Sequence, residues 1–405
     1  MEPVPDGRGV AITGLGLVQP HGVGVESAEA VFEGRSAVAW RPEIGAISDA
    51  TGAAVRGFVP PPGTEWLDRA VQFAVAAAEE AWARSGLAEV RVPPERVATV
   101  LSLSKGGLFA LDRWAACPTG DGFPIAQATP DAAARTVAAR LGLTGPIGAP
   151  IAACASGGHA LTWGATLIRR GVVDVALVGA AEASLHPMIL GSYRRMGVLA
   201  SPGDDPSTSV RPFSATRRGF AVGEGAGVLV LESDASVRRR GVWPTARVCA
   251  WAAGCQTRGL MEMEPGGETL AYLIREGLRR AGIGPADVDY IHAHGTATPA
   301  NDAAEARAIG AALGDAAAGV SVSSTKGSHG HLLGAAASVE LVLVALAMDR
   351  GLVPPTANLT DPDPAIGLDC TPLRPRRRTI RHALKISSGF GGQALVVVLG
   401  KPAEA

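Results

Sequence analysis

Short apolar runs alternate with amphipathic segments along most of the 405 residues, and this alternation limits the chain to few fold classes. The runs at 8–18, 96–104 and 172–183 are rich in Val, Ala, Leu and Gly. Such runs are typical of buried strands, whereas the segments between them, for example 65–87, have the 3.6-residue periodicity of helices. Strands that alternate with helices predict an α/β protein with mostly parallel sheets.

The alternation occurs twice. The charged and proline-containing segment at 238–248 interrupts it, and a second series of strands and helices then follows. We therefore predict two structural halves, residues 1–242 and 243–405, a division that suits the length of the chain. The repetition of the pattern suggests duplication, although the identity between the halves is too low to prove it.

Composition and charge exclude several classes of function. The chain is 47% apolar and 19% charged, a composition that predicts a globular protein. Its net charge of −1 gives no indication of a nucleic-acid or membrane partner. Five cysteines without CxxC spacing imply neither a disulfide framework nor a zinc knuckle, which favours a reducing cytoplasm. The first residues do not have the pattern of a signal peptide.

Residues 141–168 contain no Asp, Glu, Lys or Arg, which is long enough to suggest a membrane span. Two prolines and six glycines argue against one. We predict instead a strand up to Ala153, a turn at Cys154 and a helix to Arg170. Before this stretch, we predict a surface loop over 112–130 and then a helix, with Thr129 as its N-cap and Pro130 as its first residue.

Cys154 is the first candidate for chemistry. A turn of small residues, "AACASGG", would place it at the start of a helix, where backbone N–H groups and the helix dipole favour a thiolate and can form an oxyanion hole. The alternative is a buried, unreactive cysteine, which is equally common at such a position.

Four of the eight histidines form two His-x-His pairs, His292 with His294 and His329 with His331. A metal-dependent hydrolase would use them as ligands, but no HExxH occurs, and Asp289 and Asp302 are the only carboxylates near either pair at strand or helix spacing, which disfavours a metal. Alternatively, one histidine of each pair meets the cysteine. A thiolate with two neutral imidazoles suits acyl transfer followed by stabilisation of an enolate.

Several motifs in order carry a resemblance to a known family. These are "ACASGGHAL", "GFAVGEGAGVLVLE", "AHGTATPANDAAEA", "SSTKGSHGHLLGAAASVE", "VPPTANL" and "SSGFGGQALVVVLG". Together they resemble the elongating beta-ketoacyl-ACP synthases, and most of all the ketosynthase (KSα) subunit of type II polyketide synthases. The resemblance covers nearly the whole chain. It implies a thiolase-like fold, in which two related αβα halves form a five-layered αβαβα core.

The resemblance also assigns roles. It implies that Cys154 is the acyl-accepting nucleophile and that His294 and His331 promote decarboxylation of the malonyl unit. The remaining implied residues are the supporting Lys326 and Glu340, the pantetheine-binding Thr296 and Thr298, and the gating Phe390, whose N–H would form the oxyanion hole with that of Cys154.

The implied reaction is a decarboxylative Claisen condensation of malonyl-ACP with a Cys-bound acyl chain, an acyltransferase activity that needs no metal or organic cofactor. The implied partners are an acyl carrier protein (ACP) and a second subunit. That subunit is either a copy of this chain or a chain-length-factor-like protein. The alternative within the family is a housekeeping fatty-acid ketosynthase. The presence of Cys154 argues against a non-catalytic partner subunit.

Some residues depart from the family pattern. Ser388 stands where fatty-acid enzymes usually have phenylalanine, and Lys105 stands where an apolar residue borders the acyl pocket at the dimer interface. We expect Lys105 either to turn to solvent or to meet a polar acyl chain or a partner subunit. His292 and His329 also depart from the pattern, so we expect them to be non-catalytic. Arginines at 238–240 or 374–381 are candidates for docking the acidic carrier.

Overall fold

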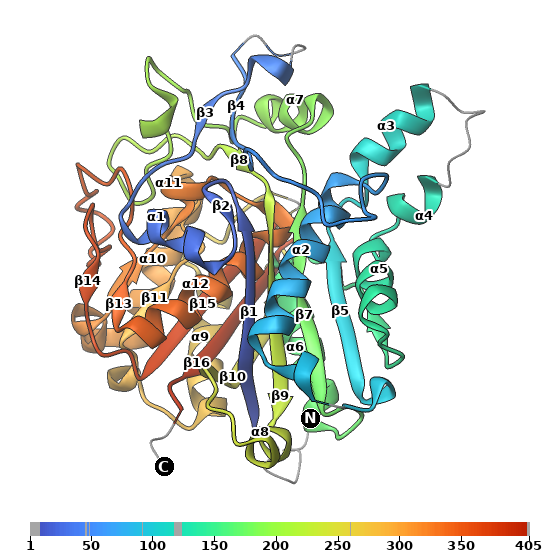
Figure 1. Cartoon of the computed structure of the whole chain (residues 1–405). Coiled ribbons are helices and arrows are strands. Elements are labelled where there is room, and N and C mark those ends of the chain that lie inside the picture. Colours follow the sequence, from blue (N-terminus) through green and yellow to red (C-terminus); the bar gives the residue numbers. More distant parts are fainter. Residues whose placement is uncertain are drawn as a thin grey trace.

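The computed structural model describes residues 9–402 except 45–46, 48, 91, 117–123 and 260. Ten strands form two sets of five that match in order (Figure 1). The first set is β1 (Val10–Gln19), β5 (Val97–Leu103), β6 (Ile147–Gly148), β7 (Val175–Glu182) and β9 (Gly225–Ser233). The second set is β10 (Ala246–Cys255), β11 (Tyr290–His292), β12 (Ser321–Ser323), β15 (His382–Gly389) and β16 (Gln393–Gly400).

The two sets have the same topology. From the centre outwards the strand order is β1-β9-β7-β5-β6 in one half and β10-β16-β15-β11-β12 in the other. In both halves the two inner pairings are antiparallel and the two outer pairings are parallel. The halves join through three residue pairs between β1 and β10. The expected duplication is therefore visible in the pairing, and the predicted boundary falls between α8 (Asp234–Arg240) and β10.

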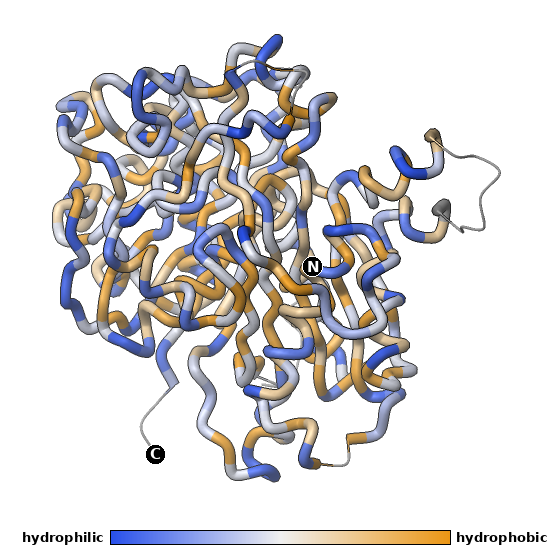
Figure 2. The backbone as a smooth tube through the Cα atoms, turned by 45° about the horizontal axis from the view of Figure 1, so that its top comes forward, coloured by the Kyte–Doolittle hydropathy of each residue, from blue (hydrophilic) through white to orange (hydrophobic). Residues whose placement is uncertain are grey.

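The long helices supply the other three layers. In the middle, α6 (Ser156–Arg169) and α12 (Ala336–Arg350) pack on each other and contact strands of both halves. On the outer faces, α2 (Arg69–Arg84) and α5 (Ala132–Leu141) cover the first half, and α9 (Glu268–Ala281) and α10 (Pro299–Leu313) cover the second. This arrangement is the expected five-layered αβαβα core. In Figure 2, hydrophobic stretches run through the middle of the body, whereas many of the hydrophilic stretches lie at its rim.

Shorter elements complete the chain. The helices are α1 (Glu29–Phe32), α3 (Leu108–Ala116), α4 (Pro124–Ala128), α7 (Pro187–Arg195) and α11 (Lys326–His329). The strands are β2 (Gly22–Val23), β3 (Ala39–Trp40), β4 (Thr51–Ala53), β8 (Val222–Gly223), β13 (Leu352–Val353) and β14 (Arg376–Arg377). In both views, α3 and α4 project from the body (Figures 1 and 2).

Three expectations were wrong. The sheets are not mostly parallel, because two of the four pairings in each half are antiparallel. One of these follows from the short hairpin at 390–392, since a strand returned by a hairpin must run antiparallel. The expected loop at 112–130 contains the end of α3 and the whole of α4, while 117–123 lie outside the described residues. Neither Thr129 nor Pro130 starts α5, which begins at Ala132 after Asp131.

The two central helices begin with the same turn. The N–H of Ala155 donates to the carbonyl of Ala152 before α6, and the N–H of Ala335 donates to the carbonyl of Leu332 before α12, both at 2.9 Å. Ala153 and Leu333 each have φ of 46°, a left-handed conformation that non-glycine residues rarely adopt. Cys154 and Gly334 therefore occupy matching positions in the two halves.

The crossing of α6 and α12 requires glycine at position 157. A Cβ atom there would lie 2.7 Å from Cβ of Ser338 in α12. We expect Gly157→Ala to lower the free energy of unfolding by about 2 kcal/mol, because helices in a packed core cannot separate without losing contacts. Gly310→Ala in α10 is the control, since its Cβ would meet nothing within 4 Å. Urea unfolding measures both variants, and equal effects would contradict this account of the helix crossing.

Candidate active site

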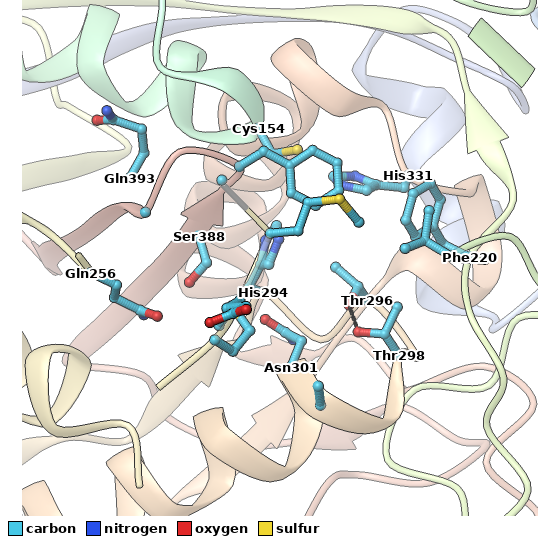
Figure 3. A pocket seen from close by; sticks show the side chains of 18 of the residues that line it. Cys154, Phe220, Gln256, His294, Thr296, Thr298, Asn301, His331, Ser388 and Gln393 are labelled. Carbon is cyan, nitrogen blue, oxygen red and sulfur yellow. Dashed lines mark hydrogen bonds between the residues drawn. The ribbon is translucent and has the colours of Figure 1, made fainter. Parts of the chain in front are cut away.

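The predicted residues converge on one cavity of about 150 Å³ (Figure 3). It lies where the turn before α6, the loop after β11, the loop after α11 and the β15–β16 hairpin meet. Its lining includes six of the predicted site residues, Cys154, His294, Thr296, Thr298, His331 and Phe390. Apolar side chains make up much of the remaining wall, among them Val198, Phe220, Met261, Met263 and Leu333.

Cys154 is a buried free thiol in the turn that starts α6. Burial raises its pKa to about 11, although Lys105 and Lys326 act in the opposite direction. Removal of the sulfur from water outweighs the favourable lysine charges, so the Cys154 side chain is a thiol at neutral pH, whatever stabilisation of a thiolate the start of α6 contributes. The backbone nitrogen of Cys154 lies beside Gly389, because a Cβ atom built on Gly389 would be only 3.1 Å from that nitrogen. The hairpin that carries Phe390 therefore lies against the cysteine turn.

The rings of His294 and His331 lie next to each other in the cavity wall. Their ring centroids are 5.4 Å apart and the rings are nearly perpendicular. The N–H of His331 donates to Ala221 at 2.7 Å, and its carbonyl accepts from Gly223 at 2.9 Å, so β8 and its flanking residue hold the backbone of this histidine. Phe220 packs edge-on against the His331 ring at 5.0 Å.

Burial, followed by the positive charge of Lys326, lowers the pKa of both catalytic candidates well below the usual 6.5. Both imidazoles are therefore neutral at pH 7. A neutral imidazole has one N–H donor and one acceptor nitrogen, which suits hydrogen bonding to a thioester oxygen without storing a charge.

Lys326 and Glu340 do not line the cavity but lie directly behind it. The Lys326 ammonium is 2.5 Å from Glu340 and donates at 2.5 Å to the carbonyl of His294. A second ammonium, that of Lys385 in β15, lies 2.9 Å from the other oxygen of Glu340. Burial would raise the pKa of Glu340, but the two lysines outweigh it and hold that pKa well below 4.5. All three side chains are essentially inaccessible to solvent.

The other two histidines form a separate hydrogen-bonded group. Nε2 of His292 and Nε2 of His329 lie 3.0 and 2.7 Å from the hydroxyl of Thr325. Burial lowers the pKa of His292 to about 3 and that of His329 to about 4. Neither histidine lines the cavity, and both are fully buried, so each His-x-His pair has one member in the cavity and one packed behind it.

The two threonines lie at the start of α10. Their hydroxyl oxygens are 2.8 Å apart, with Thr298 at the N-cap position. Glu305, about two turns further into the helix, accepts from the backbone N–H groups of His294 and Gly295 at 2.6 and 2.8 Å. Burial raises the pKa of Glu305 to about 7. This carboxylate thus fixes the loop that carries both His294 and the threonines.

Lys105 and Ser388, two of the departures from the family pattern, differ in position: Ser388 lines the cavity and Lys105 does not. The Lys105 ammonium does not turn freely to solvent but lies 3.3 Å from the buried Glu182, and Lys105 is not among the residues that line the cavity. Ser388 does line it, and within the described residues its hydroxyl has no hydrogen-bond partner.

Three polar residues that support the site were not predicted from the sequence: Glu182, Glu305 and Lys385. The spacing of Glu305 three residues after Asp302 placed it on the same helix face, which was a usable signal. Lys385, a charged residue between Leu384 and Ile386, was another. Neither signal named the partner, because the partners are distant in sequence.

Among the described residues, no group of three or more His, Cys, Asp or Glu side chains could hold a metal ion. Within the same residues, no helix combines the length and the apolar character that crossing a membrane would need. The uncharged stretch at 141–168 contains the end of α5, the short β6, the cysteine turn and most of α6.

Comparison with known families identifies this arrangement. The profile "Beta-ketoacyl synthase, N-terminal domain" matches residues 7–236, and "Beta-ketoacyl synthase, C-terminal domain" matches residues 245–360. The chain belongs to the beta-ketoacyl synthase family. Members of this family are condensing enzymes of the acyltransferase class, so the resemblance drawn from the sequence motifs is confirmed.

Curated relatives cover most of the chain. The "Oxytetracycline polyketide putative beta-ketoacyl synthase 1" of Streptomyces rimosus is 34% identical over 99% of both chains. The "Tetracenomycin polyketide synthase ketoacyl synthase alpha subunit" of Streptomyces glaucescens is 36% identical over 83% of this chain and 82% of its own. The "3-oxoacyl-[acyl-carrier-protein] synthase 2" of Synechocystis is 32% identical over 97% of this chain and 98% of its own.

Two solved structures share the fold. A type II PKS acyl-carrier protein in complex with its ketosynthase bound to the hexaketide contains a chain with a TM-score of 0.91 and 30% identity, which covers 98% of this chain and 100% of that one. The ishigamide ketosynthase/chain length factor has a TM-score of 0.86 and 31% identity over 98% of this chain and 100% of that one. The thiolase-like fold expected from the motifs is thereby confirmed.

The raised pKa of Cys154 predicts how its alkylation depends on pH. Only the thiolate reacts, so the rate should rise about tenfold per pH unit from pH 7 to pH 10 without a plateau. Iodoacetamide labelling followed by peptide mass analysis gives the rate at Cys154, with the exposed Cys255 as a check that the reagent is active. A plateau in the labelling rate by pH 8 would contradict the account, because it would mean that burial does not raise the pKa of Cys154.

Proposed function

We propose that this protein is a ketosynthase of a type II polyketide pathway. An acyl group passes from the thioester of an ACP to Sγ of Cys154, and the carrier thiol leaves. Malonyl-ACP then loses CO₂, and its enolate carbon attacks the Cys154 thioester. A C–C bond forms, the C–S bond to Cys154 breaks, and beta-ketoacyl-ACP is released.

One observation carries the proposal. Segments that are distant in sequence bring Cys154, His294 and His331 to one cavity, and Thr296 and Thr298 also belong to its lining. A thiol and two neutral imidazoles are what the two half-reactions need, namely a nucleophile and hydrogen-bond donors for an enolate oxygen.

The surrounding residues have supporting roles in this proposal. The N–H groups of Cys154 and Phe390 would stabilise the tetrahedral oxyanion, since the β15–β16 hairpin lies against the cysteine turn. Lys326, itself paired with Glu340, would hold His294 through its carbonyl, and the charges of Lys326 and Lys385 would add to burial in keeping His294 neutral. The threonine hydroxyls would bind the pantetheine arm. Loss of CO₂ drives the reaction, so we propose no metal or organic cofactor.

The proposed partners are an ACP and a second subunit. The neighbouring structures include one of a ketosynthase with its acyl-carrier protein and one of a ketosynthase/chain length factor. Beside the edge strand β6, the apolar side chains of Ile147, Ile151 and Trp163 are exposed by 45%, 57% and 42%. Exposed apolar side chains at a sheet edge are typical of a subunit contact. A dimer, either with itself or with a chain-length-factor-like chain, would cover them, and we place the complex in the cytoplasm.

Acyl loading and condensation test the function directly. Incubation with acyl-ACP should add the acyl mass to the Cys154 peptide, and addition of malonyl-ACP should yield beta-ketoacyl-ACP. His331→Ala should lose condensation by at least a hundredfold, because it removes a hydrogen-bond donor in the cavity.

His329→Thr is the matched variant, since His329 contacts Thr325 and not the cavity. We expect it to keep most activity and to lower the free energy of unfolding by about 1–3 kcal/mol, because a buried hydrogen bond is lost. Equal loss of activity in both variants would contradict the division of each histidine pair, and absence of any Cys154 adduct would contradict the function.

The Synechocystis relative supports a second candidate, a fatty-acid elongation ketosynthase. The two candidates differ in substrate and partner. Efficient elongation of saturated medium-chain acyl-ACP by the chain alone would favour the fatty-acid enzyme. A requirement for a co-expressed chain-length-factor-like subunit would favour the polyketide enzyme.

We propose a docking surface for the carrier other than the two arginine runs. Arg240 is paired with Glu232, and Arg376 with Asp369, so neither predicted arginine run is wholly free. In Figure 1, α8, which carries 238–240, lies at the bottom, whereas α7, β8 and α11 near the cavity lie in the upper part. Three other arginines, Arg195, Arg218 and Arg258, are exposed, lie within three residues of the cavity lining and have no ion pair within the described residues.

Charge reversal tests this surface. We expect Arg218→Glu to raise the KM for ACP substrates about tenfold, because it removes attraction to an acidic carrier at the cavity mouth. The effect should weaken as salt concentration increases. Arg239→Glu on α8 is the control and should leave KM unchanged. Equal increases for both variants would contradict docking beside the cavity.

A further inference from the structure

One buried carboxylate near the cysteine has no part in the proposed reaction. Glu182 ends β7 with 3% of its side chain exposed. Its Oε2 accepts from the Ser104 hydroxyl at 2.5 Å and from the backbone N–H of Gly334 at 2.9 Å. The Ser184 hydroxyl also donates to it, and Lys105 lies 3.3 Å away. Glu182 therefore links the first half of the chain to the turn that starts α12 in the second half.

The internal duplication relates the contact between Glu182 and Gly334 to the turn that contains Cys154. Gly334 occupies the same place in the turn before α12 as Cys154 does in the turn before α6. The N–H of Gly334 is bound to a carboxylate, whereas no hydrogen bond from the N–H of Cys154 is found among the described residues. In the turn before α12, the N–H of Gly334 thus binds the carboxylate of Glu182. In the turn before α6, the equivalent N–H belongs to Cys154, the proposed nucleophile.

The held turn shapes the cysteine side of the cavity. Leu333 adopts a left-handed conformation that costs about 1–3 kcal/mol unless its surroundings impose it. Its side chain lines the cavity and belongs to one apolar cluster with Cys154 and Leu185. The backbone of His331 is held separately, by the carbonyl of Ala221 and the N–H of Gly223. Release of the turn should therefore disturb Cys154 more than His331.

Close packing leaves the turn little freedom to find another partner. A Cβ at position 334 would lie 2.4 Å from Cβ of Ser104, so glycine is required there. Loss of the carboxylate would leave the N–H of Gly334 buried without a partner, which a structure tolerates poorly.

We propose that Glu182 is a positioning residue for acyl transfer. By binding the N–H of Gly334, it holds Leu333 against Cys154 and so shapes the surface that receives the incoming acyl group, while Lys105 balances its charge. The inference rests on the proposed function, since it assumes that Cys154 accepts the acyl group.

Two partial reactions separate this role from general stability. We expect Glu182→Ala to slow acyl loading of Cys154 at least tenfold, while decarboxylation of malonyl-ACP without a primer stays within about twofold of the wild type. Glu182→Gln keeps an acceptor oxygen for Gly334 and should load within about threefold of the wild type. Glu182→Asp keeps the charge but has a shorter reach, and should load as slowly as Glu182→Ala.

Glu224→Ala is the matched control. Glu224 is also a buried carboxylate that binds a backbone N–H, that of Val55 at 3.0 Å, and a cation, Arg69 at 2.8 Å. It should leave the ratio of loading to decarboxylation unchanged. If Glu182→Ala does not fold, the comparison of Glu182→Gln with Glu182→Asp decides.

Unchanged loading in Glu182→Ala or Glu182→Asp would overturn the proposal. So would equal losses of loading and decarboxylation, which would indicate a structural role alone. If the wild type itself neither loads Cys154 nor decarboxylates malonyl-ACP, the proposed function fails instead.

Discussion

The site depends on one buried charged group, in which Glu340 is held between Lys326 and Lys385. Each ion alone would be costly to remove from water, and removal of one partner of a buried pair typically costs about 3–5 kcal/mol. The three side chains come from α11, α12 and β15, so the chemistry requires these elements to be assembled. Two cations against one carboxylate leave a positive field behind the cavity. Burial first, and then that field, keep His294 and His331 neutral.

The duplicated architecture explains where the cavity lies. The same strand order and the same helix-starting turn occur in both halves, and the two central helices start close together. The first half uses its turn to present Cys154, and the second half has glycine at the matching position and places His331 just before the turn. A single αβα unit could not supply both groups, so the cavity is a property of the pair.

Much of the fold could be predicted from the sequence, because apolar runs report buried strands wherever neighbouring helices cover them. The runs that became β1, β5 and β7 are of this kind. The strand β15 was not recognised, since Lys385 and two serines interrupt its apolar pattern, and the lysine is tolerated there through Glu340 of α12. The antiparallel pairings were not predicted from the sequence either, because the direction of a strand depends on how it is connected to its neighbours and not on its composition.

The chemical groups were predicted more securely than their ionisation. The motifs named the residues that line the cavity, but the resting state of Cys154 depends on how deeply the fold buries the sulfur. For the same reason, the sequence could not show that His292 and His329 share the hydroxyl of Thr325. Burial and long-range pairing decide such properties, and neither is a local feature of the chain.

The central claim is that the cavity histidines stay neutral under working conditions. Nitrogen-15 NMR of labelled imidazoles, assigned with His294→Gln and His331→Gln variants, measures this directly. The account predicts that both rings remain uncharged at pH 6 and show no titration between pH 5.5 and pH 8. An imidazolium signal from either ring, with a midpoint near the ordinary value of about 6.5, would contradict it.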